Sequence, residues 1–262
     1  MMPAHDPDID PSPVLAAARA GAFDRYIAAL LAPAVARPDL MALAAFAAEI
    51  SRVPTLVKEP MAGEIRLQWW RDAVATGPDN PQTGNPVADA LRLAAHRHDL
   101  PIPLLHGLVD AVSDLLTGRD AFDRDQWRRH LFKTEGTLFD LSARIAGAPA
   151  GSSIAPAVEA AAEAYGFARA LHGDAGLTIR LKTRGELDDL IKQAAAAHWR
   201  CAAALAPVSP ALWPVFAPVA LVSLYLDSLG EQGPDGRRDV VALPPVRRLW
   251  RLWRAARTGR FA

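Results

Sequence analysis

The feature that most constrains this chain is the spacing of its apolar residues, which is helical almost throughout. Ala, Leu, Arg and Glu dominate, β-branched residues are scattered, and no segment alternates apolar and polar residues as a half-buried strand would. Proline and glycine turns separate helix-sized pieces, for example at Pro38-Asp39, residues 77–81 and residues 147–151. The pattern predicts an all-α fold of roughly nine to eleven helices.

Composition limits the kinds of partner that this chain can have. The 262 residues are 51% hydrophobic, which is enough for a substantial core. Lys plus Arg equals Asp plus Glu at 29 each, so no net field attracts nucleic acid, and we expect no nucleic-acid partner. The single cysteine, Cys201, cannot form an internal disulfide. A reducing, cytoplasmic location fits best.

The chain contains no linker that is both long and polar, so we predict one helical domain over residues 22–243. Residues 1–21 begin with acids and prolines where a signal peptide would be basic and apolar, and we expect a disordered lead-in. Residues 244–262 form a predicted basic, amphipathic C-terminal helix. The uncharged run Cys201–Leu226 is long enough to span a bilayer, but its four prolines favour a loop and two buried helical pieces.

Acidic and histidine pairs are the candidates for metal chemistry, since no Cys-x-x-Cys, His-Glu-x-x-His or phosphate-binding glycine loop is present. Asp110 and Asp114 share a face of a predicted helix, which either lines an interior or is simply solvated. His96 and His98 point to different faces, which favours a solvated helix end. None of these pairs by itself establishes a metal site.

A second helical pattern covers Pro60–Ala75, where Ile65, Trp69 and Asp72 share one stripe. Leu67, Trp70 and Val74 lie beside that stripe, so we expect a helix that is covered on most sides.

The C-terminal segment contains six arginines and no acidic residue from Arg247 onward. Helical spacing places Leu249, Leu252, Trp253 and Ala256 on one face and Arg247, Arg251 and Arg254 on the opposite one. One reading is a helix that docks its Leu/Trp face on the protein with its arginines in water. The other is contact with an anionic membrane or an acidic partner, made by Arg247, Trp250, Arg251, Trp253 and Arg254.

The order of segments over roughly Phe23–Leu229 resembles the squalene/phytoene synthase family. Arg37 and the Ala45-Phe46 pair match the family's arginine followed by an Ala-Phe helix. Leu67, Trp70 and Arg71 match its Leu/Trp pattern, and Asp114-Leu115, Gly147 and Gly166 match the segments that follow. The resemblance implies an isoprenoid-synthase-like helical bundle around a central cavity.

In catalytic members of that family, two aspartate-rich motifs hold Mg²⁺ ions, which neutralise the leaving diphosphates of two joined prenyl diphosphates. Aligned on Ala45-Phe46, the first motif falls on Ser51, Arg52 and Thr55, where two hydroxyls and a guanidinium replace carboxylates. Pro54 would end or kink the helix inside that motif.

The second motif should follow Gly166, where Asp174 is the only acid and Leu177 and Leu181 occupy expected aspartate positions. The resemblance therefore implies that both halves of the metal site are missing. It points to the non-catalytic branch of the family, which includes a mitochondrial respiratory complex I assembly factor.

Three functions stay open at this point. The first is a non-catalytic factor that assists the biogenesis of a membrane complex, peripheral on the inner membrane and without a cofactor. The second is a prenyl-transferring synthase, which would need Mg²⁺ held by Asp110, Asp114 and Asp174. The third is an isoprenoid or lipid carrier, in which Arg52, Lys58 or Arg66 meets an anionic head group.

Overall fold

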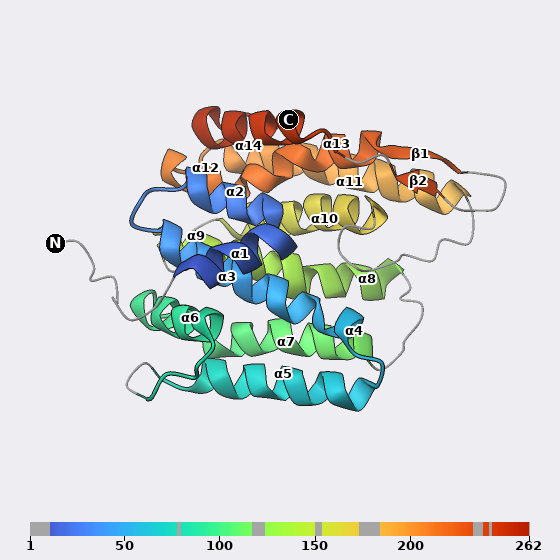
Figure 1. The fold of residues 1–262 in the computed structure, drawn as a ribbon. Coiled ribbons are helices and arrows are strands. Elements are labelled where there is room, and N and C mark those ends of the chain that lie inside the picture. Colours follow the sequence, from blue (N-terminus) through green and yellow to red (C-terminus); the bar gives the residue numbers. More distant parts are fainter. Residues whose placement is uncertain are drawn as a thin grey trace. The chain divides into compact units, whose positions relative to one another are not determined.

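Helices form nearly all of the regular structure in a computed structural model of the chain (Figure 1). The structure describes residues 11–77, 80–116, 124–149, 154–172, 184–232, 238–240 and 243–261. Those residues divide into two compact units, which are described separately. The first unit comprises residues 1–120 and 140–150, and the second comprises residues 121–139 and 151–262. The all-α prediction is confirmed, and the predicted domain bounds at residues 22 and 243 stay a prediction.

The first unit is built around α3, which packs against α1, α2 and α6, while α5 packs against α7. Asn85 caps α6, because its side-chain oxygen accepts hydrogen bonds from the backbone N–H groups of Val87 and Ala88. The elements are α1 (Pro11–Gly21), α2 (Phe23–Leu31), α3 (Arg37–Ser51), α4 (Val53–Leu56), α5 (Pro60–Ala75), α6 (Pro86–Arg97), α7 (Ile102–Leu116) and the end of α9 (Thr137–Ile145).

The N-terminal segment corrects one prediction, because Pro11–Gly21 forms α1 rather than part of a disordered lead-in. A Cβ added to Gly21 would lie 2.6 Å from the Cβ of Ala48, so α1 approaches α3 too closely for any side chain there. This packing explains why a segment preceded by acids and prolines is helical. Residues 1–10 of the predicted lead-in lie outside the described part of the chain.

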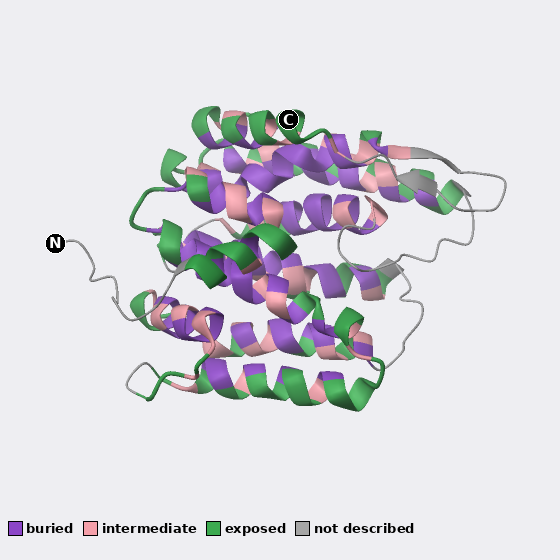
Figure 2. Ribbon diagram, viewed as in Figure 1, coloured by how far each residue is buried: buried purple, intermediate pink, exposed green. Residues whose placement is uncertain are grey.

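Helix α5 is less covered than its sequence predicts. Leu67, Trp70 and Val74 are buried as expected. Ile65 and Trp69, however, are exposed together with Met61, and Figure 2 shows exposed residues along the whole helix. The periodicity was ambiguous because apolar residues occur all around this helix, and only tertiary packing decides which of them are covered.

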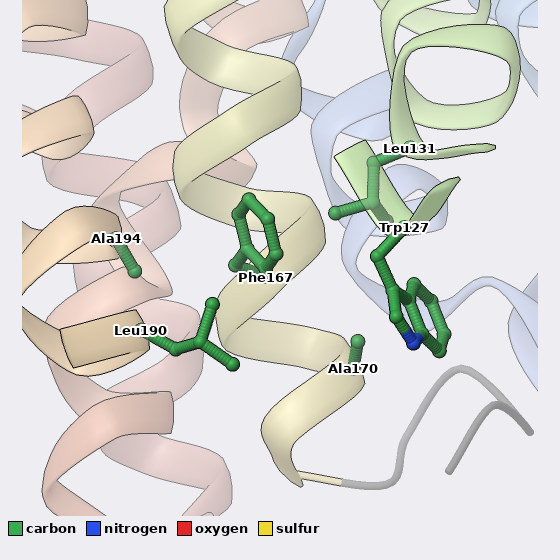
Figure 3. Close-up of a cluster of buried hydrophobic side chains, with 6 residues drawn as sticks. All are labelled: Trp127, Leu131, Phe167, Ala170, Leu190 and Ala194. Carbon is green, nitrogen blue, oxygen red and sulfur yellow. The ribbon is translucent and has the colours of Figure 1, made fainter. Parts of the chain in front are cut away.

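In the second unit, the long helices α10 and α11 pack side by side, and α13 also packs against α10. Figure 3 shows a cluster that joins α8, α10 and α11, in which Phe167 lies between Leu131 and Leu190. The elements are α8 (Arg124–Leu131), the π-helix η1 (Phe132–Gly136), the start of α9, α10 (Ala155–His172), α11 (Arg184–Leu205), η2 (Pro210–Leu212), α12 (Trp213–Phe216), η3 (Ala217–Leu221), α13 (Val222–Asp227), β1 (Leu229–Gln232), β2 (Arg238–Val240) and α14 (Pro245–Thr258).

The proline-rich apolar run forms buried helical pieces, as predicted, but there are four short helices after α11 where two pieces were expected. By length and composition Pro210–Asp227 could cross a membrane, with a mean hydropathy of 1.4, but 67% of it is buried inside the protein. Phe216 of α12 stacks on Phe139 at 5.5 Å between ring centroids, and Tyr165 of α10 meets the same ring edge-on at 5.9 Å. Phe139 belongs to the first turn of α9, directly after the π-helix η1.

One element was not predicted at all. Strands β1 and β2 pair antiparallel as a hairpin, with Leu229 opposite Val240. They have only four and three residues, too few for an alternating pattern to be recognised in a sequence.

Candidate functional site

The first candidate site lies at the C-terminal end of α3. Phe46 is fully buried and meets Trp70 of α5 edge-on, with 5.4 Å between ring centroids. This contact fixes the rotation of α3. Ser51 follows five residues later and therefore projects about 140° around the helix from Phe46. In agreement with that geometry, Ser51, Arg52 and Thr55 are all exposed.

The polar groups at this helix end are bound locally. The Ser51 hydroxyl donates to the carbonyl oxygen of Ala48 at 3.1 Å, and the Thr55 hydroxyl donates to that of Arg52 at 2.7 Å. Arg52 donates from Nη1 to the carboxylate of Glu49 at 3.1 Å. Each side chain thus bonds to a backbone carbonyl or a charged group of its own turn. The carboxylate among these contacts, that of Glu49, is already paired with a cation.

The helix break predicted at Pro54 is present. Helix α3 ends at Ser51, and Pro54 lies in the first turn of the separate helix α4. Lys58, in the bend before α5, and Arg66, on α5, are exposed. They are available to solvent, as an anion-binding role would require.

The acidic pair on α7 forms part of a polar network with α5. Asp110 accepts a hydrogen bond from Nε of Arg71 at 2.8 Å, and Nη1 of Arg71 binds Glu64 at 2.8 Å. The hydrogen bond from Ser113 lowers the pKa of Glu64, and Arg71 lowers it further, against the opposing effect of burial. Asp110 and Asp114 are both exposed, which favours the solvated face over the interior position.

The second aspartate position cannot be placed, because Asp174, Leu177 and Leu181 lie outside the described residues. Among the residues that the structure does describe, no three His, Cys, Asp or Glu side chains are grouped closely enough to hold a metal ion.

Buried ion pairs are the polar feature that sequence reasoning missed. Asp39 of α3 is 3% exposed and accepts hydrogen bonds from Nη1 of Arg97 at 2.6 and 2.7 Å. His98 lies 2.8 Å from the same carboxylate, so the prediction of a solvated His98 was wrong. Because Arg97 lies 58 residues from Asp39 in the chain, no local pattern could have revealed the pair.

Two further pairs hold α10 in the second unit. Glu163 is buried and accepts hydrogen bonds from Gln193 and Arg200 of α11, both at 2.6 Å. Glu135 of η1 is also buried and binds Arg169 at 3.0 Å. A carboxylate in such surroundings needs a charged or hydrogen-bonded partner, so these contacts are structural.

The end of α10 carries a small polar cluster. The His172 ring meets Tyr225 edge-on at 5.0 Å between centroids, and among the described residues neither of its buried ring nitrogens has a hydrogen-bond partner. Arg248 donates to the Tyr225 hydroxyl at 3.3 Å. Tyr225 is fully buried, so the cluster lies in the interior of the second unit.

The C-terminal helix α14 divides its apolar residues between two surfaces. Leu252, Ala255 and Ala256 are buried, but Trp250 and Trp253 are exposed. The prediction that a single Leu/Trp face docks on the protein was therefore wrong for Leu249 and Trp253, which are 41% and 49% exposed, and right for Leu252 and Ala256. The arginines are not simply solvated either, since Nη1 of Arg251 donates to Ser223 at 2.9 Å, and Arg254 lies over the Trp250 ring at 4.9 Å.

Known proteins resemble this chain in both sequence and fold. The human protein named NADH dehydrogenase (ubiquinone) complex I, assembly factor 6 is 31% identical over 126 residues, which is 48% of this chain and 38% of that protein. The bovine and mouse proteins of the same name are each 29% identical over the same length. The chain thus matches well under half the length of these relatives.

The fold is that of a dehydrosqualene synthase, whose crystal structure with a ligand superposes with a TM-score of 0.68. The superposition covers 92% of this chain and 93% of that one at 11% identity, so it supports the isoprenoid-synthase-like helical fold alone. The profile of the squalene/phytoene synthases matches residues 18–175, more than half of the chain. The chain therefore belongs to the squalene/phytoene synthase family.

Proposed function

We propose that this protein is a non-catalytic member of its family that acts as an assembly or binding factor for a membrane respiratory complex of the complex I type. The observation that carries the proposal is the set of local contacts made by the side chains at and just after the C-terminal end of α3. Ser51 and Thr55 donate their hydroxyl protons to backbone carbonyls, and Arg52 brings a cation paired with Glu49. A guanidinium repels Mg²⁺, and the hydroxyls offer no negative charge to replace the missing carboxylates.

The same groups explain why synthesis is not expected. A leaving diphosphate carries several negative charges, and clustered cations must stabilise it as the carbon–oxygen bond breaks. A relocated metal site would need Asp110, but that carboxylate already binds Arg71. The relatives named as assembly factors support the assembly role, and a place at the face of the membrane that holds that complex follows from it.

The catalytic part of the proposal is tested with the purified chain, Mg²⁺ and farnesyl or geranylgeranyl diphosphate. We expect no release of pyrophosphate above the rate without protein, while an active squalene/phytoene synthase serves as the positive control. Steady turnover by the wild type, abolished by Asp110→Asn and Asp114→Asn together, would establish the synthase instead.

The assembly part is tested in cells that lack the chain. We expect less assembled complex I on native gels and lower NADH:ubiquinone oxidoreductase activity in their membranes. Wild type and the Ser51→Ala/Thr55→Ala variant should restore both to the same level, because the proposal assigns no chemistry to these hydroxyls. A complex that assembles normally without the chain would refute this role.

A carrier of an isoprenoid or lipid is the second candidate, and it is favoured by the ring nitrogens of His172 beside Tyr225, which have no hydrogen-bond partner within the part of the chain that the structure describes. Native mass spectrometry of the purified protein should then detect a lipid that His172→Phe releases. Arg19→Ala, which removes an exposed arginine of α1, is the control and should retain the lipid.

A further inference from the structure

The outward face of α14 is an apolar stripe on the surface of the second unit. Its members recur at the three- and four-residue spacing of one helix face, which lies beside the buried face. The part of Figure 2 that draws α14 shows exposed residues alternating with the buried ones. The stripe consists of Val246, Leu249, Trp250 and Trp253, which are 79%, 41%, 52% and 49% exposed.

The stripe is held rigidly by the buried face of the same helix. Leu252 is fully buried, and α14 packs against α12 and η3. Gly259 ends the helix in the left-handed conformation, at φ 66°, where a Cβ would lie 2.8 Å from the Trp213 ring. Phe261 then buries its side chain beyond that turn. The exposed tryptophans therefore stand on a fixed helix and do not belong to a loose tail.

Positive charge accompanies the stripe. Arg247, Arg257 and Arg260 are exposed, and no acidic residue occurs from Arg247 to the last residue of the sequence. Arg254 lies over the Trp250 ring, which keeps a further cation beside the apolar face. Apolar stripe and arginines together form a surface that is locally cationic although the whole chain is neutral.

We propose that this surface docks on an anionic phospholipid bilayer, with Trp250 and Trp253 inserted at the level of the head groups. Tryptophan prefers that interface because its ring is apolar and its N–H is polar. Arginines at the rim meet the lipid phosphates, and long arginine stems reach them while the stripe stays in the acyl boundary. An acidic protein groove would satisfy the arginines but gives no reason for two outward tryptophans, so the bilayer is the better match.

Vesicle flotation with the full-length protein tests this inference. Vesicles of phosphatidylcholine with phosphatidylglycerol should carry the wild type upward, and pure phosphatidylcholine should carry much less. Trp250→Ser with Trp253→Ser should weaken binding about tenfold or more. Arg247→Glu should weaken it at least about fivefold at low salt, with a smaller effect at high salt.

Matched controls come from α1 and α5, whose exposed side chains have the same chemistry. Met61→Ser with Ile65→Ser removes two exposed apolar residues of α5, and Arg19→Glu reverses an exposed arginine of α1. Both control variants should float like the wild type. Unchanged thermal unfolding of every variant shows that the fold is retained.

Failure of the wild type to float, or flotation lost in the control variants and kept in the α14 variants, would overturn the inference. Pyrophosphate release is measured on the same preparations. A protein that floats and also turns over prenyl diphosphates refutes the non-catalytic proposal and leaves the role of α14 intact. A protein that neither floats nor releases pyrophosphate refutes the role of α14 and leaves the non-catalytic proposal intact.

Discussion

His198 Nε2 lies 2.5 Å from the carbonyl oxygen of Phe261, so that α11 is tied to the turn that follows α14. A carbonyl only accepts hydrogen bonds, and the ring must therefore carry its proton on Nε2. Burial lowers the pKa of His198 below its ordinary value of 6.5, and Arg251 lowers it further, although the Phe261 carbonyl opposes this shift.

The lowered pKa of His198 predicts a loss of stability in mild acid. Above pH 6.5 the ring is neutral in both states and its effect is constant. Below that pH the unfolded chain binds a proton that the folded chain refuses, so the free energy of unfolding falls as the pH falls. Melting temperatures between about pH 8 and about pH 5 should decline less steeply for His198→Gln than for the wild type. Parallel pH profiles would contradict this assignment.

Removing Arg200 should destabilise the protein by about 2–3 kcal/mol, because buried Glu163 would keep only Gln193 as a partner. This value is below that for a fully buried pair, since the Arg200 side chain is 56% exposed. Urea unfolding of Arg200→Met measures the loss. Arg128→Met is the control. Arg128 of α8 lies 4.0 Å from Glu159, an exposed residue of α10, and this pair should contribute less than about 1 kcal/mol.

Two glycine-to-alanine changes should have opposite effects. At Gly21 the added Cβ would lie 2.6 Å from Ala48, which should cost about 1–3 kcal/mol of stability. At Gly107, in the middle of α7, no atom lies within 4 Å of the added Cβ, and better helix propensity should stabilise the protein by about 0.5–1 kcal/mol. Chemical unfolding of the two variants decides, and equal effects would argue against the close packing of α1 on α3.

Cys201 should be unreactive in the folded protein. Burial raises the pKa of its thiol to about 12, so little thiolate forms near neutral pH. Labelling with a disulfide reagent at about pH 8 should be slow in buffer and fast in denaturant, following the opening of α11 away from α10. Rapid labelling without denaturant would show that this interface opens readily.

The sequence predicts the helices well because their signals are local. The spacing of apolar residues correctly gives an all-α fold, and Pro54 correctly gives the break after α3. Prolines between Pro207 and Pro218 correctly turned an apparent membrane span into short buried pieces. Family membership followed from the order of such segments.

What the sequence could not give depends on contacts between distant residues. Asp39 and His98 have no pattern that joins them, and each looks like an ordinary solvated side chain until α3 packs on α6. Likewise, α14 has apolar residues on two sides, and only the position of α12 and η3 decides that Leu252 is covered and Trp250 is not. The same holds for Ile65 on α5.

The π-helix η1 has a consequence for changes in chain length. A π turn holds one residue more than an α turn, and in an α-helix each residue advances the side chains by about 100°. Deleting one residue from Phe132–Gly136 would convert the wide turn to a regular one and rotate all of α9 by that angle relative to α8. Phe139 would then swing away from Tyr165 and Phe216. The extra residue of the π turn thus sets the angle between the apolar side of α8 and that of α9, although the two are stretches of one continuous helix.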